Sequence, residues 1–258
     1  MTKIHPSAIV EKGVELDSDL EVGAYAYIGG SAKIGSGTVV AHHATVDGNT
    51  VLGKCNQIFP YAFIGGKTHD LKYKGGNPGL RIGDNNVFRE YTTAHCSTAD
   101  KNFTIIGNNN NILAYSHIAH DCIVGDYIVM SSHSALGGHV IVEDHAVIGW
   151  GSGAHQFCRI GAYAMLSASS KLVKDLPPFF MADGSPAEVC AINKINMQRN
   201  GFSPEEIELV YSAFKLIYRR RLTRPHAIEE LSMRDSSSNR VIKAIIEFAN
   251  GSSERGLA

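Results

Sequence analysis

Two histidines and an aspartate crowd into one short stretch, residues 116–122, which reads Ser-His-Ile-Ala-His-Asp-Cys. Imidazole suits proton transfer, because its reference pKa of about 6.5 leaves it largely neutral yet basic near physiological pH. We therefore expect chemistry at His120, with Asp121 beside it. The simpler alternative is a turn histidine whose hydrogen bonds are satisfied by the neighbouring carboxylate.

This stretch belongs to a repeat in which an aliphatic or small apolar residue, here called the anchor, returns every six positions. The period fits neither a helix nor a simple strand, so it describes a repeated supersecondary unit. Three hexads per turn predict a parallel β-helix, with each anchor pointing inward and stacking on the one a coil away. The anchors after residue 105 are Ile106, Ile112, Ile118, Val124, Met130, Leu136, Val142, Ile148, Ala154, Ile160, Leu166 and Leu172.

Stacked coils would bring together histidines that are far apart in the sequence. The anchors Ile118, Leu136 and Ala154 should share one face in successive coils. His120, His139 and His155 follow these anchors closely, so all three should project near the same edge of the prism.

The first 64 residues keep the same period, and two interruptions follow. Segment 65–81 is rich in polar residues, Gly and Pro, and segment 95–105 delays the next anchor, so both should loop out. Counting faces in threes, both loops leave from the edge that carries the three histidines. A cleft walled by loops is expected there.

The period changes near the C-terminus, which predicts two domains: a β-helix over residues 1–186 and an α-helical domain over residues 187–258. Ser203-Pro204-Glu205-Glu206 has the capping hydroxyl, the proline and the glutamate of a helix start. Further helices are expected over 225–233 and 240–250.

Composition excludes several classes of protein. Lys plus Arg is 24 and Asp plus Glu is 25, which argues against a nucleic acid or an anionic membrane as the main partner. No apolar run approaches the roughly 18 residues of a membrane span, and there is no signal peptide core. The chain has five cysteines, an odd number that argues against a disulfide framework and favours a cytoplasmic protein. Cys122 and Cys158 should pack in the interior rather than act as nucleophiles.

Several motifs carry a resemblance over essentially the whole chain. They are His117-Ile118-Ala119-His120-Asp121-Cys122, Asp70-Leu71-Lys72-Tyr73, Gly138-His139-Val140, Ala154-His155-Gln156-Phe157-Cys158, Asp175-Leu176-Pro177-Pro178 and Arg199-Asn200-Gly201-Phe202. With these insertions and separations the chain resembles the UDP-N-acetylglucosamine O-acyltransferases, the first acyltransferases of lipid A biosynthesis.

The resemblance implies a left-handed parallel β-helix, a homotrimer with active sites between subunits, and an acyl donor carried on acyl carrier protein. It implies transfer of a (3R)-hydroxyacyl group to the 3-hydroxyl of UDP-N-acetylglucosamine, with no metal and no cofactor. By resemblance, His120 matches the general base, Asp121 the residue that orients it, and the Gly138 N–H the oxyanion donor. The matched substrate contacts are Asp70, Lys72, His117, His139 and Gln156 around the sugar, and His155, Asn193 and Arg199 around the nucleotide.

This sequence departs from the family pattern at three positions. Ile195 stands where family members have Glu near the uracil, and Asn200 where they have a second Arg. His69 stands where some have Gln, which bears on whether the acceptor carries a 3-hydroxyl or a 3-amino group. Ala168 matches the position that sets acyl length, and its small side chain should leave room for a medium or long chain.

Other interpretations remain open from the sequence alone. Three histidines on a β-helix could hold zinc, as in γ-class carbonic anhydrases. The later N-acyltransferase of the same pathway carries an extra N-terminal domain, whereas hexads here begin at Ile4. A non-catalytic scaffold is the remaining option. The arginines at positions 219, 220, 221 and 224 could dock the acidic carrier protein or form a solvated helix face.

Overall fold

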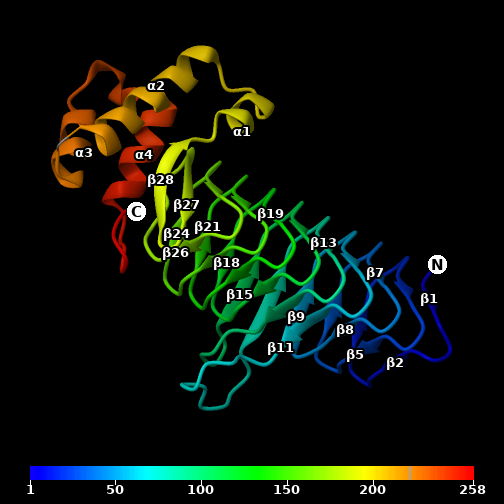
Figure 1. Cartoon of the computed structure of the whole chain (residues 1–258). Helices are drawn as coiled ribbons and strands as arrows, with labels where there is room; N and C mark the ends of the chain where they lie inside the picture. Colours follow the sequence, from blue (N-terminus) through cyan, green and yellow to red (C-terminus); the bar gives the residue numbers. More distant parts are fainter. Residues whose placement is uncertain (221) are drawn as a thin grey trace.

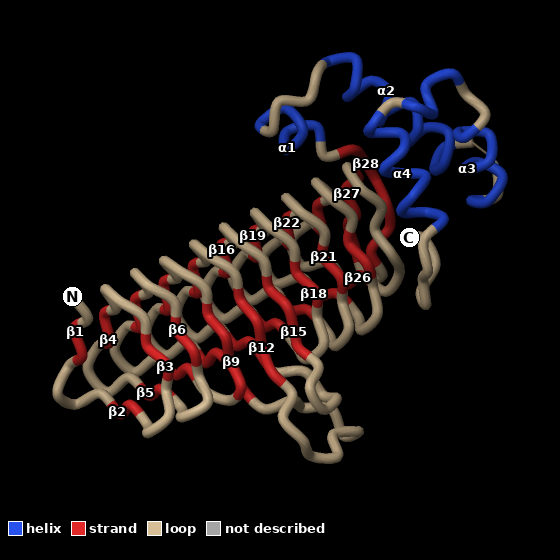
Figure 2. The backbone as a smooth tube through the Cα atoms, turned by 180° about the vertical axis from the view of Figure 1, so that it is seen from behind, coloured by secondary structure: helices blue, strands red, loops and turns tan. Residues whose placement is uncertain are grey.

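The chain folds into a long three-sided prism capped at one end by helices, as seen in a computed structural model (Figure 1). The structure describes residues 1–220 and 222–258. The N-terminus lies at the far end of the prism from the helices, and one long loop projects from its side (Figure 2). This is the parallel β-helix that the hexads predicted, with the left hand that the family resemblance implied.

Each turn of the chain contributes one short strand to each side of the prism. The β1 face contains β1 (Lys3–Ile4), β4 (Glu21–Val22), β7 (Val39–Val40), β10 (Gln57–Ile58), β13 (Val87–Phe88), β16 (Asn111–Ile112), β19 (Val129–Met130), β22 (Val147–Ile148), β25 (Met165–Leu166), β27 (Phe180–Gly184) and β28 (Ala187–Ile192). The β2 face contains β2 (Ile9–Val10), β5 (Tyr27–Ile28), β8 (Thr45–Val46), β11 (Phe63–Gly66), β14 (Thr93–His95), β17 (His117–Ile118), β20 (Ala135–Leu136), β23 (Gly153–Ala154) and β26 (Lys171–Leu172). The β3 face contains β3 (Glu15–Leu16), β6 (Lys33–Ile34), β9 (Asn49–Leu52), β12 (Gly79–Ile82), β15 (Phe103–Ile106), β18 (Ile123–Val124), β21 (Ile141–Val142) and β24 (Arg159–Ile160).

The strand register confirms how the anchors were assigned to faces. On the β2 face Ile64 pairs with Ala94, Ala94 with Ile118, Ile118 with Leu136, and Leu136 with Ala154. Both interruptions therefore open at the β2/β3 edge, the edge that the chain crosses between these two faces.

The interior is filled by the anchors and by a second inward residue four positions after each of them. Cys122 and Cys158 occupy this second position and are fully buried, and burial raises the pKa of each thiol to about 12. Packing is therefore their role, as predicted. Asn86 and Asn110 hold the same position, and Asn86 Oδ1 accepts from the Asn110 N–H at 3.0 Å, so these amides link successive coils.

Glycines at the corners allow neighbouring coils to approach closely, and few of them are needed for a positive φ angle. The positive φ angles at the corners fall mostly on non-glycine residues three positions after an anchor, such as Asp121 and His139. Glycine directly after an anchor lies against the next coil. A Cβ on Gly23 would stand 2.5 Å from the backbone nitrogen of His42. Gly65, which follows the Ile64 anchor, does have a positive φ of +87°.

Both excursions are shorter than the sequence indicated. They span residues 67–78 and 96–102, because β11, β12, β14 and β15 extend into the predicted segments 65–81 and 95–105. Leu80, two residues before the Ile82 anchor, also points inward and is fully buried. This burial stabilises the additional residues at the start of β12.

The C-terminal part is helical from residue 194, because residues 187–192 form strand β28, antiparallel to β27. The division into domains at about residue 186 stays a prediction. Ser203 caps its helix in a capping box with Glu206, as expected. Within the described residues no helix is long and apolar enough to cross a membrane. The helices are α1 (Lys194–Arg199), α2 (Pro204–Phe214), the π-helical η1 (Lys215–Arg219), α3 (Arg224–Ser232), the 3₁₀ turn η2 (Asp235–Ser238) and α4 (Arg240–Asn250).

Candidate active site

His120 and Asp121 form the corner between β17 and β18, on the β2/β3 edge. Their side chains are 13% and 11% exposed, so both are largely screened from water. His120 Nδ1 lies 2.8 Å from Asp121 Oδ2. An ionised carboxylate only accepts hydrogen bonds, so Nδ1 carries the hydrogen and Nε2 keeps a free lone pair. This tautomer is the one that a general base needs.

The second excursion holds Asp121 in its ionised form. Ser97 Oγ donates to Oδ1, and the Thr98 N–H lies 3.2 Å from both carboxylate oxygens. Burial alone would raise the pKa of Asp121, but the hydrogen bonds from Ser97, His120 and Thr98 outweigh it and the pKa is lowered. The Thr98 hydroxyl also lies 3.0 Å from His120 Nδ1.

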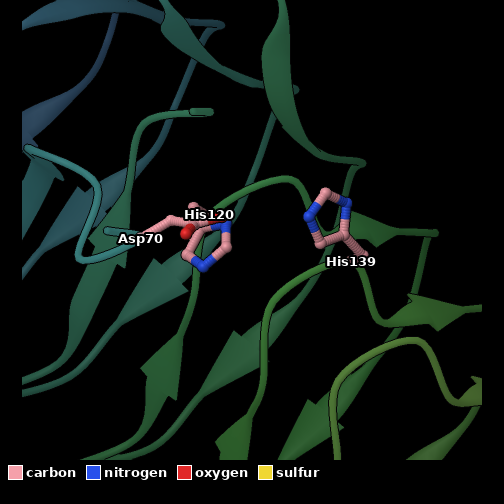
Figure 3. A group of neighbouring side chains, drawn as sticks. All are labelled: Asp70, His120 and His139. Atoms are coloured by element: carbon pink, nitrogen blue, oxygen red, sulfur yellow. The ribbon is translucent and has the colours of Figure 1, made fainter. Parts of the chain in front are cut away.

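Asp70 and His139 complete the group around His120. The ligand atoms of Asp70, His120 and His139 all lie within 4.8 Å of one another. Figure 3 shows Asp70 beside His120 and His139 across from them. His139 Nε2 also lies 3.7 Å from Asp121 Oδ2. Two imidazoles and a carboxylate at this spacing could hold a divalent metal ion.

A groove of about 1190 Å³ lies between the excursions and the β3 face, and Asp70, Asp121 and His139 line it beside His120. The first excursion contributes Asp70 and Lys72 to its lining, and the coils contribute His139 and Phe157. Asp70 Oδ1 accepts from the Lys72 N–H at 2.9 Å, which fixes the turn that presents both side chains. The predicted cleft walled by loops is therefore present.

Gly138 lies directly beneath the His120 ring. A Cβ on Gly138 would stand 2.5 Å from His120 Cε1 and 2.7 Å from Nε2. Among the hydrogen bonds of residues 1–220 and 222–258, none uses the Gly138 N–H. This N–H therefore has no partner among those residues and could donate to an external oxygen.

His117 belongs to a second histidine group on the β2 side of the edge. Its Nδ1 lies 2.7 Å from Thr93 Oγ1, and its ring meets His95 edge-on at 4.9 Å. His69 contacts His95 at 4.1 Å between ring centres. Burial, with smaller contributions from His117, His69 and His120, lowers the pKa of His95 to about 4. Burial also lowers the pKa of His117.

The remaining predicted residues are spread over all three edges. His155 and Gln156 lie on the β2/β3 edge, in the coil after His139. Ala168 lies on the β1/β2 edge, between β25 and β26. Asn193 is buried on the β3/β1 edge, where its amide donates to the Tyr163 carbonyl at 2.9 Å, and Arg199 follows in α1. One chain does not bring these three groups together.

Two of the three positions that depart from the family pattern, Ile195 and Asn200, lie on α1 and at its end, whereas His69 lies in the first excursion. Ile195 is exposed on α1. Asn200 caps the end of this helix, and its amide donates to Asn196 Oδ1 at 2.9 Å. Of the basic group, Arg220 and Glu230 pair at 3.3 Å, and Arg221 lies outside the described residues.

Comparisons with known proteins agree on one family. A profile for domain 2 of UDP-N-acetylglucosamine O-acyltransferases matches residues 175–258. An acyl-[acyl-carrier-protein]--UDP-N-acetylglucosamine O-acyltransferase of Burkholderia lata is 42% identical and covers 100% of this chain and 99% of its own. The chain belongs to the UDP-N-acetylglucosamine O-acyltransferase family. A relative from Thermodesulfovibrio yellowstonii is 40% identical over 90% of both chains.

Solved structures of this family superpose closely. The Francisella novicida acyltransferase has a TM-score of 0.95 at 36% identity, covering 99% of this chain and 93% of its own. The Acinetobacter baumannii enzyme has a TM-score of 0.95 at 39% identity and covers 99% of both chains. This chain is thus an acyltransferase with the left-handed β-helix of the family.

The groups of this acyltransferase that support the His120–Asp121 pair could not be found from the six-residue period. Ser97 and Thr98 lie within an excursion that was recognised only by its broken period. His95 was seen as the start of that loop, although it is a buried neighbour of His117. Hydroxyl residues between the Ala94 anchor and the missing anchor at position 100, at the edge of the histidines, were the available signal.

Proposed function

We propose that this acyltransferase moves a (3R)-hydroxyacyl group from acyl carrier protein to the 3-hydroxyl of UDP-N-acetylglucosamine, the first step of lipid A biosynthesis. The observation that carries the chemistry is the His120–Asp121 pair, set against the Gly138 backbone at the mouth of a groove. The names of relatives at about 42% identity support the two substrates.

His120 acts as the general base in this proposal. Nε2 takes the proton of the sugar 3-hydroxyl while that oxygen attacks the thioester carbonyl. Asp121, ionised and bonded to Nδ1, stabilises the imidazolium that forms. When the tetrahedral intermediate collapses, the C–S bond breaks and the imidazolium returns the proton to the leaving sulfur. Proton transfer of this kind contributes roughly 10²–10⁴-fold to the rate.

Gly138 supplies the oxyanion donor. The thioester oxygen becomes negative in the intermediate, and the N–H of Gly138, a residue that lies against the His120 ring, would stabilise it. Glycine is required here because any side chain would displace the base. Acyl transfer from a thioester is downhill, so neither a metal nor a cofactor is needed.

The substrate contacts are assigned by resemblance to the family. We assign Asp70, Lys72, His117, His139 and Gln156 to the sugar and the assistance of the base, and His155, Asn193 and Arg199 to the nucleotide. Asp70, Lys72 and His139 line the groove beside the dyad, which supports their assignment.

A homotrimer would explain why the assigned residues occupy different edges. Ala168 and Arg199 lie on edges that face away from His120, so a neighbouring chain must bring its own copies to the groove. The β1/β2 edge supports such association, because it exposes a ladder of aromatic rings. Its exposed members are Tyr25, Tyr61, Tyr91, Tyr115 and Trp150.

The acidic carrier protein is assigned to the basic side of the helical region. Lys194, Lys215, Arg219 and Arg220 surround one hollow there, which gives a concentrated positive surface. The competing interpretation of a solvated helix face predicts no effect of charge reversal on the donor KM.

One assay tests the proposed reaction. The purified chain is offered UDP-N-acetylglucosamine, or its 3-amino analogue, with a panel of (3R)-hydroxyacyl carrier proteins, and products are identified by mass spectrometry. The 3-O-acyl product is expected, and it should vanish in His120→Ala while the assembly mass is unchanged. Exclusive acylation of the 3-amino sugar would instead show that the acceptor carries a 3-amino group, and it would assign to His69 a role in selecting that acceptor. Full activity of His120→Ala would refute the general base.

A zinc enzyme resembling γ-class carbonic anhydrases is the second candidate, because Asp70, His120 and His139 come within ligand spacing. Metal analysis of the purified protein separates the two. Stoichiometric zinc whose removal abolishes turnover would favour the metal, whereas acyl transfer that survives chelation favours His120 as base.

A further inference from the structure

The last residues of the chain return from α4 to the β-helix. The Asp175 N–H donates to the Gly256 carbonyl at 2.8 Å, and the Ala258 N–H donates to the Asp175 carbonyl at 2.8 Å. The Asp175 side chain is fully buried and pairs with Arg159 at 2.8 Å. The C-terminal segment 251–258 is therefore fixed to the prism by backbone pairing beside a buried ion pair.

This segment places Arg255 on the β2/β3 edge. Its Nε donates to the Gln156 carbonyl at 2.9 Å, and its Nη2 lies 2.8 Å from His155 Nδ1. The Ser253 hydroxyl accepts from the Arg255 N–H at 3.1 Å and from the Gly256 N–H at 2.8 Å, which shapes the turn that presents the guanidinium. Two of the substrate residues assigned above are thus held by one arginine.

The contact with His155 has a defined direction. A guanidinium only donates hydrogen bonds, so His155 Nδ1 is the acceptor. The hydrogen of the neutral ring then sits on Nε2, which points a donor away from Arg255. A donor N–H beside a fixed positive charge suits an anionic oxygen.

Arg255 is also close to the catalytic groups. Phe157 lies beneath its guanidinium, 6.0 Å from the ring centre, and stacks on His139 at 4.6 Å with an angle of 9° between the rings. The Phe157 N–H donates to the Gly138 carbonyl at 3.0 Å. Arg255 therefore stands over Phe157, one coil beyond the proposed oxyanion donor, and Phe157 itself lines the groove.

The charge of Arg255 is open to an external anion. Within residues 1–220 and 222–258, no carboxylate lies within ion-pair distance of its guanidinium, although other arginines such as Arg159 and Arg240 are paired. The side chain is only partly buried. Arginine recognises phosphate with a rigid fork of N–H donors, and the partly exposed guanidinium of Arg255 could bind a phosphate in this way.

We propose that Arg255 is a positioning and binding residue for the diphosphate of the nucleotide sugar. It orients His155 as an Nε2–H donor and adds its own charge next to that donor. This inference rests on the proposed function, since it assigns a further residue to the same site.

Steady-state kinetics of Arg255→Met and Arg255→Lys test the proposal directly. Glu254→Gln, a change at the exposed neighbouring residue, is the control. Arg255→Met should raise the KM for UDP-N-acetylglucosamine about tenfold or more, the cost of losing charge-assisted hydrogen bonds. The kcat and the KM for the acyl carrier protein should change less than about threefold, and Arg255→Lys should fall between. An unchanged KM for the nucleotide sugar, or a rise confined to the acyl carrier protein, would overturn it.

Two further measurements separate this inference from the reaction itself. Calorimetric binding of UDP alone should weaken about tenfold in Arg255→Met, whichever group is acylated, and equal binding by both proteins would contradict the diphosphate contact. Nitrogen-15 spectra of His155 should show the Nε2–H tautomer in the wild type and a mixture in Arg255→Met. A wild-type ring protonated at Nδ1 would refute the orienting role. A double variant with His155→Ala should lose less than the sum of the single changes.

Discussion

The imidazole of His120 rests against the backbone of Gly138, one coil away in the β-helix, so closely that a Cβ there would meet Nε2 at 2.7 Å. The base and the oxyanion donor are therefore positioned by the same contact. This relationship depends on the stacking of coils, because the two residues occupy neighbouring rungs of one edge.

Gly138→Ala tests this contact. The added methyl would push the ring from its place between Gly138 and Asp121, so kcat should fall about 100-fold while the fold survives. Steady-state kinetics and thermal melting would measure both effects. Gly153→Ala is the matched control, since its Cβ would have no neighbour closer than 3.8 Å. Equal kinetics of the two variants would contradict the shared positioning.

Asp121→Asn should lower kcat about 100-fold or more with a smaller effect on KM. The amide is neutral and can donate to Nδ1, which would place the hydrogen of His120 on Nε2 and remove the base. Asp126→Asn serves as control, because its oxygen can still accept from the Asn108 N–H at another edge. Retained activity in Asp121→Asn would show that the carboxylate is dispensable.

His95 should make stability depend on pH. Its pKa is about 4 in the folded chain against a reference of 6.5, so between these values the unfolded chain binds a proton that the folded chain does not. The free energy of unfolding should therefore fall as pH drops from 7.5 to 5, by about 1–2 kcal/mol from this group.

His95→Leu should remove that part of the pH dependence in thermal melts at pH 7.5 and 5. The buried Nδ1 has no hydrogen-bond partner in the described part of the chain, so an apolar side chain costs little there. The exposed His42→Leu should melt with the wild-type pH dependence. Identical pH profiles for His95→Leu and the wild type would refute this origin of the effect.

Ala168→Met should shift the preferred acyl chain to a shorter length. The larger side chain would fill the floor of the chain groove, which Ala168 leaves open by resemblance to the family. Product distributions with carrier proteins bearing different acyl lengths would measure the shift, and an unchanged preference would remove Ala168 from this role.

Exchange of Arg220 and Arg221 for glutamate should raise the KM for the acyl carrier protein. The increase should be larger at low salt, because screening weakens attraction between exposed charges. The KM for the nucleotide sugar serves as the internal control. A donor KM that is unaffected at every ionic strength would assign these arginines to a solvated face.

The histidine cluster illustrates what residue types alone could predict. His120 and Asp121 were identified because they are adjacent in the sequence and lie in a repeat with few other polar groups. Their partners Ser97 and Thr98 lie in the preceding coil, inside a loop whose path the hexads do not describe. Nothing in the period places Arg255 near His155, because only the return of the C-terminal segment brings the two residues together.

By itself the sequence determined the prism, because a six-residue period permits only one way of stacking anchors, and this stacking assigns every corner to an edge. The tertiary structure of the loops and of the C-terminal segment decided which hydrogen-bond donors surround Asp121 and His155. These donors belong to segments that do not follow the six-residue repeat. Local pattern governs repeated backbone geometry, whereas contacts between irregular segments depend on shape and charge that appear only once the coils are stacked.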